Sequence, residues 1–150
     1  VDASPRRWAV TFAPGEVQAV CRDKGAGGIS DRLRTAGRPA AIQLTSDAGT
    51  IGSDFDSMIY VRARVVDAKG VTVPNAEHLL HFSVEGAGEL IATDNGSVTD
   101  HRPFASPDRQ PREGTAVALV RGAGDGRFTV KVRADGLASG SIELQARKGR

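Results

Sequence analysis

Apolar and polar residues alternate along most of this chain, which is the pattern of β-strands that bury one face. The clearest run covers residues 58–67, and we expect it to form a strand in the centre of its sheet. Turn sequences rich in glycine, proline and aspartate separate this run from shorter ones. The predicted strands cover residues 8–12, 16–22, 29–36, 40–46, 58–67, 79–85, 89–93, 115–121, 127–134 and 141–146, with an edge-like segment over residues 71–76.

The spacing of these runs predicts the fold class. From residue 40 onwards the strands and turns follow one another as in an immunoglobulin-like domain. A helical period competes only over residues 76–80. We therefore predict an all-β chain, an immunoglobulin-like antiparallel β-sandwich with extra N-terminal strands. The turn sequence Gly37-Arg38-Pro39 interrupts the pattern, and we place a domain boundary there, between residues 1–36 and residues 37–150.

Composition agrees with short strands and many turns, because the chain has 18 Gly and 7 Pro and only 5% aromatic residues. The 20 Lys and Arg nearly balance the 18 Asp and Glu, and no basic stripe is interleaved with aromatic residues, so we expect no nucleic-acid partner. No apolar run approaches the roughly 20 residues of a membrane-spanning helix, so we expect no membrane span. The single cysteine, Cys21, lies on the apolar side of its predicted strand, where we expect it to be half-buried.

Several blocks of sequence carry a resemblance to a known family. The blocks are Thr35 to Thr45, Val61 to Asp67, Val73 to Ala76, Phe82 to Gly88, Asp94-Asn95-Gly96, His101, Pro103-Phe104, Arg109, Gly114 and Gly136-Leu137. In their order and spacing they resemble, over nearly the whole chain, the C-terminal immunoglobulin-like domains of bacterial glycoside hydrolase family 2 enzymes of the β-galactosidase type. The chain departs from the family pattern at Phe55, Ser57 and Ser97-Val98, where we expect reshaped loops.

This resemblance implies an accessory role. Family 2 enzymes hydrolyse with two glutamates on an (α/β)8 barrel, and no such barrel fits in 150 residues. We therefore expect no catalytic residue and no cofactor, and a C-terminal module that packs on or spaces the catalytic barrel and assists substrate binding. The implied partners are the catalytic and sandwich domains of a parent enzyme located in the periplasm or outside the cell. Residues 1–36 would then be the C-terminal strands of a preceding β-sandwich domain.

The long connection over residues 97–113 is the most distinctive part of the chain, because it lacks periodicity and is rich in proline and arginine. Two interpretations of this loop stay open. In one, a turn carboxylate, a guanidinium and an aromatic ring pin the loop onto the sheet. In the other, the loop faces the barrel or the sugar, and its donors bind hydroxyl groups. The candidate contact residues are Asp94, Asn95, His101, Phe104 and Arg109.

Metal sites have little support in the sequence. His78 and His81 would point to opposite faces of a strand, and His101 lies in the long loop. Asp54, Asp56 and the pair Asp94-Asn95 lack the spacing of a calcium-binding EF-hand loop. We therefore expect no bound metal.

Two further interpretations belong to other classes of protein. The sandwich also resembles binding modules of adhesins and invasins, whose ligands are carbohydrates or cell surfaces. A self-standing enzyme has the least support, because no nucleophile with a base partner is readable from the spacing. The N-terminal apolar residues, Trp8, Val10, Phe12 and Val17, lack partners within residues 1–36. We expect them to pack on the second domain or on another copy of the chain as a homodimer.

Overall fold

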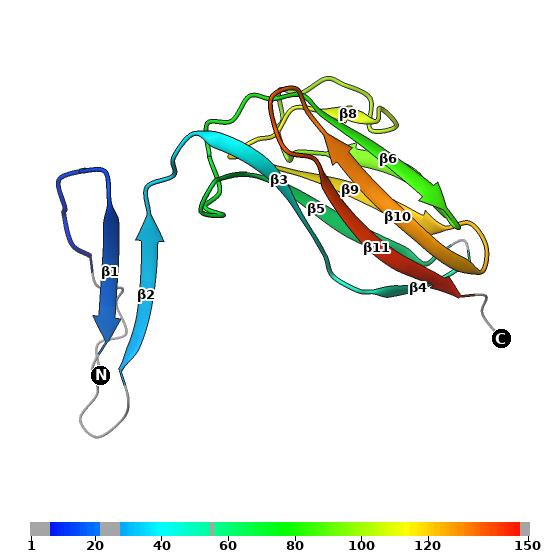
Figure 1. Cartoon of the computed structure of the whole chain (residues 1–150), viewed down its shortest axis with the longest axis horizontal. Coiled ribbons are helices and arrows are strands. Elements are labelled where there is room, and N and C mark those ends of the chain that lie inside the picture. Colours follow the sequence, from blue (N-terminus) through cyan, green and yellow to red (C-terminus); the bar gives the residue numbers. More distant parts are fainter. Residues whose placement is uncertain (1–6, 22–27, 55, 148–150) are drawn as a thin grey trace. The chain divides into compact units, whose positions relative to one another are not determined.

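The structure is a computed structural model that describes residues 7–21, 28–54 and 56–147, and within these residues it contains strands and loops but no helix (Figure 1). The chain divides into two compact units, Val1–Thr35 and Ala36–Arg150. The prediction of an all-β immunoglobulin-like sandwich is confirmed.

The first unit contains one antiparallel hairpin. Strand β1 (Glu16–Cys21) pairs with β2 (Ile29–Arg34) in a register that runs from Glu16 opposite Arg34 to Cys21 opposite Ile29. At its open end, Thr35 donates its backbone N–H to the Gly15 oxygen at 2.8 Å. The strand predicted over residues 8–12 is wrong, because the described part of this segment pairs with no described strand, and an extended segment without a ladder partner is not a strand.

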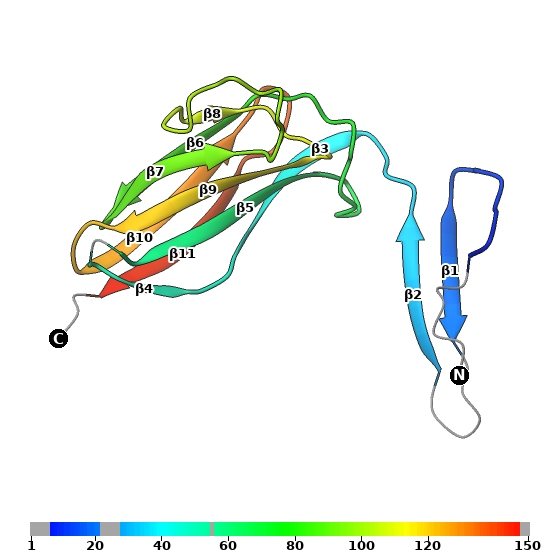
Figure 2. The ribbon, with the colours of Figure 1, turned by 180° about the vertical axis from the view of Figure 1, so that it is seen from behind.

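The second unit is a sandwich of two sheets (Figures 1 and 2). The four-stranded sheet has the order β3 (Pro39–Ser46), β5 (Met58–Asp67), β9 (Thr115–Gly122), β7 (Gly88–Asp94). The five-stranded sheet has the order β4 (Thr50–Gly52), β11 (Gly140–Arg147), β10 (Gly126–Arg133), β6 (Leu80–Gly86), β8 (Asp108–Arg109). All these neighbours are antiparallel except β4 and β11, which are parallel.

The period-two pattern is realised most clearly in β5, which lies between β3 and β9 as expected. Its residues Ile59, Val61, Ala63 and Val65 are buried between the sheets, opposite Phe82, Phe128 and the valines of β10.

Strand β4 was not expected, because three residues are too few to show an alternation. The expected edge segment over residues 71–76 makes only an isolated bridge from Thr72 to Val66, and the helical alternative over residues 76–80 does not form.

Two close contacts fix how the sandwich is assembled. Gly88 lies against the ring of Phe128, where a Cβ atom would come within 2.5 Å of that ring. Asp67, at the end of β5, is buried and accepts backbone N–H bonds from Gly37 at 2.7 Å, Lys69 at 2.8 Å and Val71 at 2.9 Å. The N–H groups of Gly37 and Val71 therefore hold the pKa of Asp67 below its ordinary value. This carboxylate ties the start of the second unit to the turn after β5.

Candidate functional site

The loop between β7 and β9 is anchored by a tight turn at each end. After β7, the backbone N–H groups of Asn95 and Gly96 donate to Asp94 Oδ1 at 2.7 and 3.1 Å. Before β9, Glu113 and Gly114 have φ angles of 51° and 72°, which are the positive angles of a two-residue hairpin turn. Gly114 has a second reason to be glycine, because a Cβ atom there would lie 2.4 Å from the carbonyl oxygen of Val73. The two turns fix where the loop leaves and rejoins the sheet.

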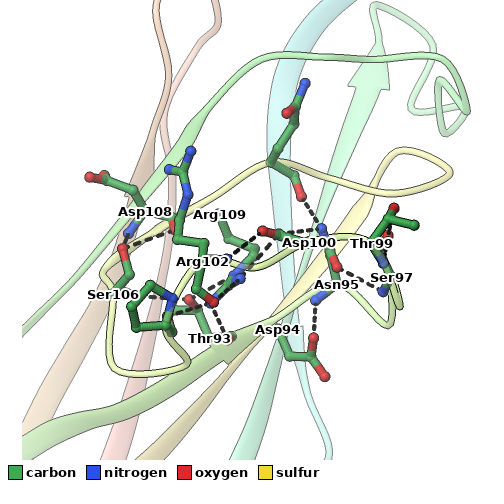
Figure 3. Close-up of polar contacts among 12 residues, drawn as sticks. Thr93, Asp94, Asn95, Ser97, Thr99, Asp100, Arg102, Ser106, Asp108 and Arg109 are labelled. Carbon is green, nitrogen blue, oxygen red and sulfur yellow. Dashed lines mark hydrogen bonds and ion pairs between the residues drawn. The ribbon is translucent and has the colours of Figure 1, made fainter.

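Arg109 lies at the centre of the loop, and its side chain is buried with a relative exposure of 1% (Figure 3). Its Nε donates to Thr93 Oγ1 at 3.1 Å. Nη1 donates to Asp100 Oδ2 at 3.1 Å and to the Arg102 oxygen at 3.1 Å. Nη2 donates to the oxygens of Thr93 and Pro103, both at 2.8 Å. A guanidinium has five N–H donors, so each of them has an acceptor within the loop or at the end of β7.

Asp100 completes this network from the opposite side of the guanidinium. Its Oδ1 accepts the backbone N–H of Arg102 at 3.0 Å, and its Oδ2 accepts Nδ2 of Asn95 at 2.9 Å in addition to Arg109. The Arg102 N–H and the Arg109 guanidinium together hold the pKa of Asp100 below its ordinary value. Asn95 Nδ2 also donates to the Gln110 oxygen at 2.9 Å, so one side chain links both halves of the loop.

The structure brings three of the five candidate residues together and leaves two outside. Asp94, Asn95 and Arg109 belong to the turn and the network just described. His101 is exposed, and the Phe104 ring is 65% exposed. Phe104 helps to hold the loop on the sheet through its backbone oxygen, which accepts the Thr93 N–H at 2.7 Å. We had expected its aromatic ring to do so.

Asp100 was missed in the sequence, although it is the acidic partner of the buried guanidinium. Its position, five residues after Asn95, belongs to no motif, and aspartates are common in loops of this composition. Thr93 was also missed, because in the sequence it is simply the end of a short strand. The network depends on the path of the backbone, which local sequence does not specify.

The three histidines of the chain do not form a cluster. His81 Nδ1 lies 2.6 Å from Asp108 Oδ1, which links β6 to β8. Within the described ranges, no group of three His, Cys, Asp or Glu side chains has the geometry of a metal site. In the same residues no helix is long and apolar enough to cross a membrane.

The hairpin of the first unit has two different sides. On one side, Glu16 forms ion pairs with Arg32 at 3.0 Å and with Arg34 at 2.5 Å, and the hydrogen bond from Arg34 lowers the pKa of Glu16. The other side is mostly apolar, and every residue of the two strands is exposed. The expectation that Cys21 is half-buried is wrong, because no described residue covers the apolar side on which it lies. That side carries Val17, Ala19, Cys21, Ile29 and Leu33, with Asp31 as its one charged residue.

The sequence model of one protein family matches residues 42–143 and is described as glycoside hydrolase family 2 C-terminal domain 5. The chain belongs to this family. The matched residues begin in β3 and end in β11, so they contain the β7–β9 loop with its buried arginine.

Relatives of this family 2 C-terminal domain are much longer chains. A β-galactosidase from Bacteroides ovatus is 29% identical over 140 residues, which are 93% of this chain and 16% of that protein. A family 2 glycosyl hydrolase from Bacteroides cellulosilyticus superposes with a TM-score of 0.84 at 28% identity, over 93% of this chain and 18% of its own. A β-glycosidase from Bacteroides vulgatus gives a TM-score of 0.86 at 27% identity, over 92% and 18%. The chain therefore spans less than a fifth of the length of these relatives.

Proposed function

We propose that this domain is a non-catalytic accessory module of a β-galactosidase-like family 2 glycoside hydrolase, where it packs on or spaces the catalytic barrel and assists substrate binding. One observation carries the proposal: nearly the whole chain matches only 16% of the Bacteroides ovatus β-galactosidase. Most of the Bacteroides ovatus protein therefore lies outside the part that matches this chain. From the same family resemblance we propose a periplasmic or extracellular location for the parent enzyme.

The carboxylates of the sandwich support a non-catalytic role. A retaining glycosidase needs two carboxyl groups about 5–5.5 Å apart, flanking the sugar. Here, Glu85 pairs with Lys131 at 2.6 Å, Glu89 with Arg121 at 2.6 Å and Glu143 with Arg127 at 3.1 Å. These three glutamates lie on strands at the outside of the sheets, where each is an acceptor in an ion pair.

The loop between β7 and β9 is one part of the module that we propose to contact the barrel or the sugar. All N–H donors of the Arg109 guanidinium are already hydrogen-bonded within the protein. Asp94 is held in the turn after β7, and Asn95 is held in the hydrogen-bond network around Asp100. Among the five candidate residues, the side chains that remain available are His101 and Phe104, which are exposed on a loop that is hydrogen-bonded from within. Holding recognition residues on a fixed frame lowers the entropy cost of binding.

We propose that residues 1–36 are strands of a preceding β-sandwich domain of the same polypeptide. A two-stranded hairpin is at best marginally stable alone, and the apolar side of β1 and β2 is uncovered. The match over 93% of the chain includes these strands, so the relatives carry the corresponding segment. A homodimer through this hairpin is the competing arrangement, and sedimentation of the purified chain as a monomer would count against it.

A carbohydrate- or cell-surface-binding module is the second candidate, and the exposed Phe104 ring favours it, because exposed aromatic rings stack on sugars. Retention of the purified chain on an insoluble glycan, lost in the variant Phe104→Ala, would support this candidate over a role in packing alone.

An assay of the purified chain tests the proposal. The chain alone should not hydrolyse a chromogenic β-galactoside, and the complete polypeptide should. Turnover by the chain alone that disappears when Glu85, Glu89 or Glu143 is changed to Gln would overturn the proposal. Each variant needs its β-sheet circular dichroism spectrum as a control for folding.

A further inference from the structure

The two sheets of the sandwich present different surfaces to the outside. On the five-stranded sheet, the outward residues of β6, β10 and β11 are all polar or charged. Ion pairs cross this face, from Lys131 to Glu85 and from Arg127 to Glu143. It is the composition of a surface that remains in water. Its outward residues are His81, Ser83, Glu85, Arg127, Thr129, Lys131, Arg133, Ser141, Glu143, Gln145 and Arg147.

The outer face of the four-stranded sheet is apolar at its centre. Tyr60, 58% exposed, lies opposite Leu119, and Arg62 lies opposite Val117. Val117 and Leu119 do not pack against the core between the sheets, so they are on the outside. Figure 2 looks onto this side of the second unit, with β5, β9 and β7 in front of β10 and β11. We call it the β5–β9 face and define it by Met58, Tyr60, Arg62, Arg64, Val117, Leu119 and Arg121.

The β5–β9 face has the composition of a protein interface. Tyr, Met and Arg are enriched in the centres of such interfaces, whereas Lys, Glu, Asp and Ser are depleted. The β5–β9 face carries the single Tyr and the single Met of the chain together with three arginines. A sugar-binding face would need more aromatic platforms than one tyrosine among aliphatic side chains.

The charges of this face indicate what the covering surface contains. Arg121 pairs with Glu89 at 2.6 Å. Arg62 is exposed and forms no ion pair with any described residue. Arg64 donates only to the neutral Gln43, at 2.6 Å, and its buried Nε has no acceptor among the described residues. Two guanidinium groups therefore lack a carboxylate partner, and a surface with carboxylates opposite them would complement the face.

We propose that the β5–β9 face is the docking surface of this module, and that it is covered by the remaining domains of the same glycoside hydrolase polypeptide, at a surface that places carboxylates opposite Arg62 and Arg64. This proposal rests on the accessory role proposed above and adds which face of the sandwich docks. The relatives support this occupant, because more than four-fifths of their length lies outside the matched part. The five-stranded sheet then faces the solvent.

Hydroxyl-radical footprinting tests the proposal, because Met58 and Tyr60 are reactive side chains and each occurs once in this chain. The purified chain and the complete polypeptide are oxidised in parallel, and the modified peptides are quantified by mass spectrometry. Oxidation of Met58 and Tyr60 should fall severalfold in the complete polypeptide. Oxidation of His81, on the five-stranded sheet, should be the same in both.

Two matched charge reversals sharpen the test. Arg62→Glu changes an exposed arginine of the β5–β9 face, and Arg133→Glu changes an exposed arginine of the five-stranded sheet. Neither should alter the unfolding midpoint of the purified chain. In the complete polypeptide, Arg62→Glu should restore the oxidation of Met58 and Tyr60, and Arg133→Glu should not.

The outcomes separate this proposal from the accessory role on which it rests. Equal oxidation of Met58 and Tyr60 in both proteins, with His81 protected instead, would overturn the docking face and leave the accessory role standing. No protection anywhere on the sandwich would overturn both. A purified chain that sediments as a dimer, and becomes monomeric on Tyr60→Glu, would replace the proposed occupant with a second copy.

Discussion

The Arg109 guanidinium holds Thr93 by two hydrogen bonds, from Nε to the side-chain Oγ1 and from Nη2 to the main-chain oxygen. Thr93 lies near the end of β7 and Arg109 forms half of β8. The two residues belong to different sheets of the sandwich, so the pair connects the sheets at the point where the chain leaves the regular strands. The long loop is thus held from its buried centre.

Replacing Arg109 with Ala should destabilise the sandwich strongly. The change removes the guanidinium donors from the Thr93 and Pro103 oxygens and removes the charged partner of Asp100, which keeps only the donors Arg102 N–H and Asn95 Nδ2. Leaving buried acceptors without a donor costs about 1–3 kcal/mol, and urea unfolding followed by circular dichroism measures the loss. Arg133→Ala, at an exposed position, is the control and should stay within about 0.5 kcal/mol. Equal unfolding midpoints for the two variants would contradict the role of Arg109.

The buried carboxylate of Asp67 should make the domain sensitive to acid. Its pKa is lower in the folded protein than the ordinary value that it has in the unfolded chain, so its contribution to stability is complete above that ordinary value and is lost as the pH falls through the folded pKa. In Asp67→Asn, stability should therefore fall less steeply below about pH 4. Urea unfolding at pH 7 and pH 3 measures this, with the exposed Asp135→Asn as control. A variant as acid-sensitive as the unchanged chain would refute the assignment.

Gly114 should tolerate no side chain. It combines a φ of +72° with a carbonyl oxygen 2.4 Å from the position of a Cβ atom. Gly114→Ala should cost about 1–3 kcal/mol, the range for strained backbone. Gly124 is the matched control, because nothing lies within 4 Å of its Cβ position and its φ is not positive. If both alanine variants unfold at the same temperature, the hairpin turn before β9 is not the constraint that we describe.

The second unit should fold without the hairpin. All members of the buried core cluster lie at residue 42 or beyond. A chain of residues 36–150 should therefore unfold in one cooperative transition with a midpoint close to that of the 150-residue chain, which differential scanning calorimetry can compare. Loss of cooperativity in the shorter chain would show that residues 1–35 belong to the same folding unit.

The fold was largely predictable from the sequence because one face of each long strand is buried. The alternation over residues 58–67 identified the central strand, and most of the other strands of the second unit followed from shorter runs. The alternation of apolar and polar residues gave wrong predictions where pairing between strands, rather than burial of one face, determines the structure. Residues 8–12 alternate but pair with no described strand, and the three residues of β4 pair without an alternation.

The candidate loop was predictable only in part. Its proline content and the turn at Asp94 marked its position, and Arg109 was among the candidates. The sequence did not show that Arg109 is buried or that Asp100 is its partner, because both depend on how the backbone folds between Asn95 and Gly114. It also did not show that the Phe104 ring points outwards, since an aromatic residue in a loop can pack or remain exposed.

The central claim is that this domain serves a catalytic part located elsewhere in the same polypeptide. Calorimetry of the complete polypeptide, with and without residues 36–150, tests it most directly when combined with kcat/KM on a β-galactoside. If the claim is correct, the shortened enzyme retains turnover but unfolds at a lower temperature, because the surface that the module covers becomes exposed. An unchanged unfolding temperature would contradict packing, and complete loss of turnover in a still folded enzyme would contradict a non-catalytic role.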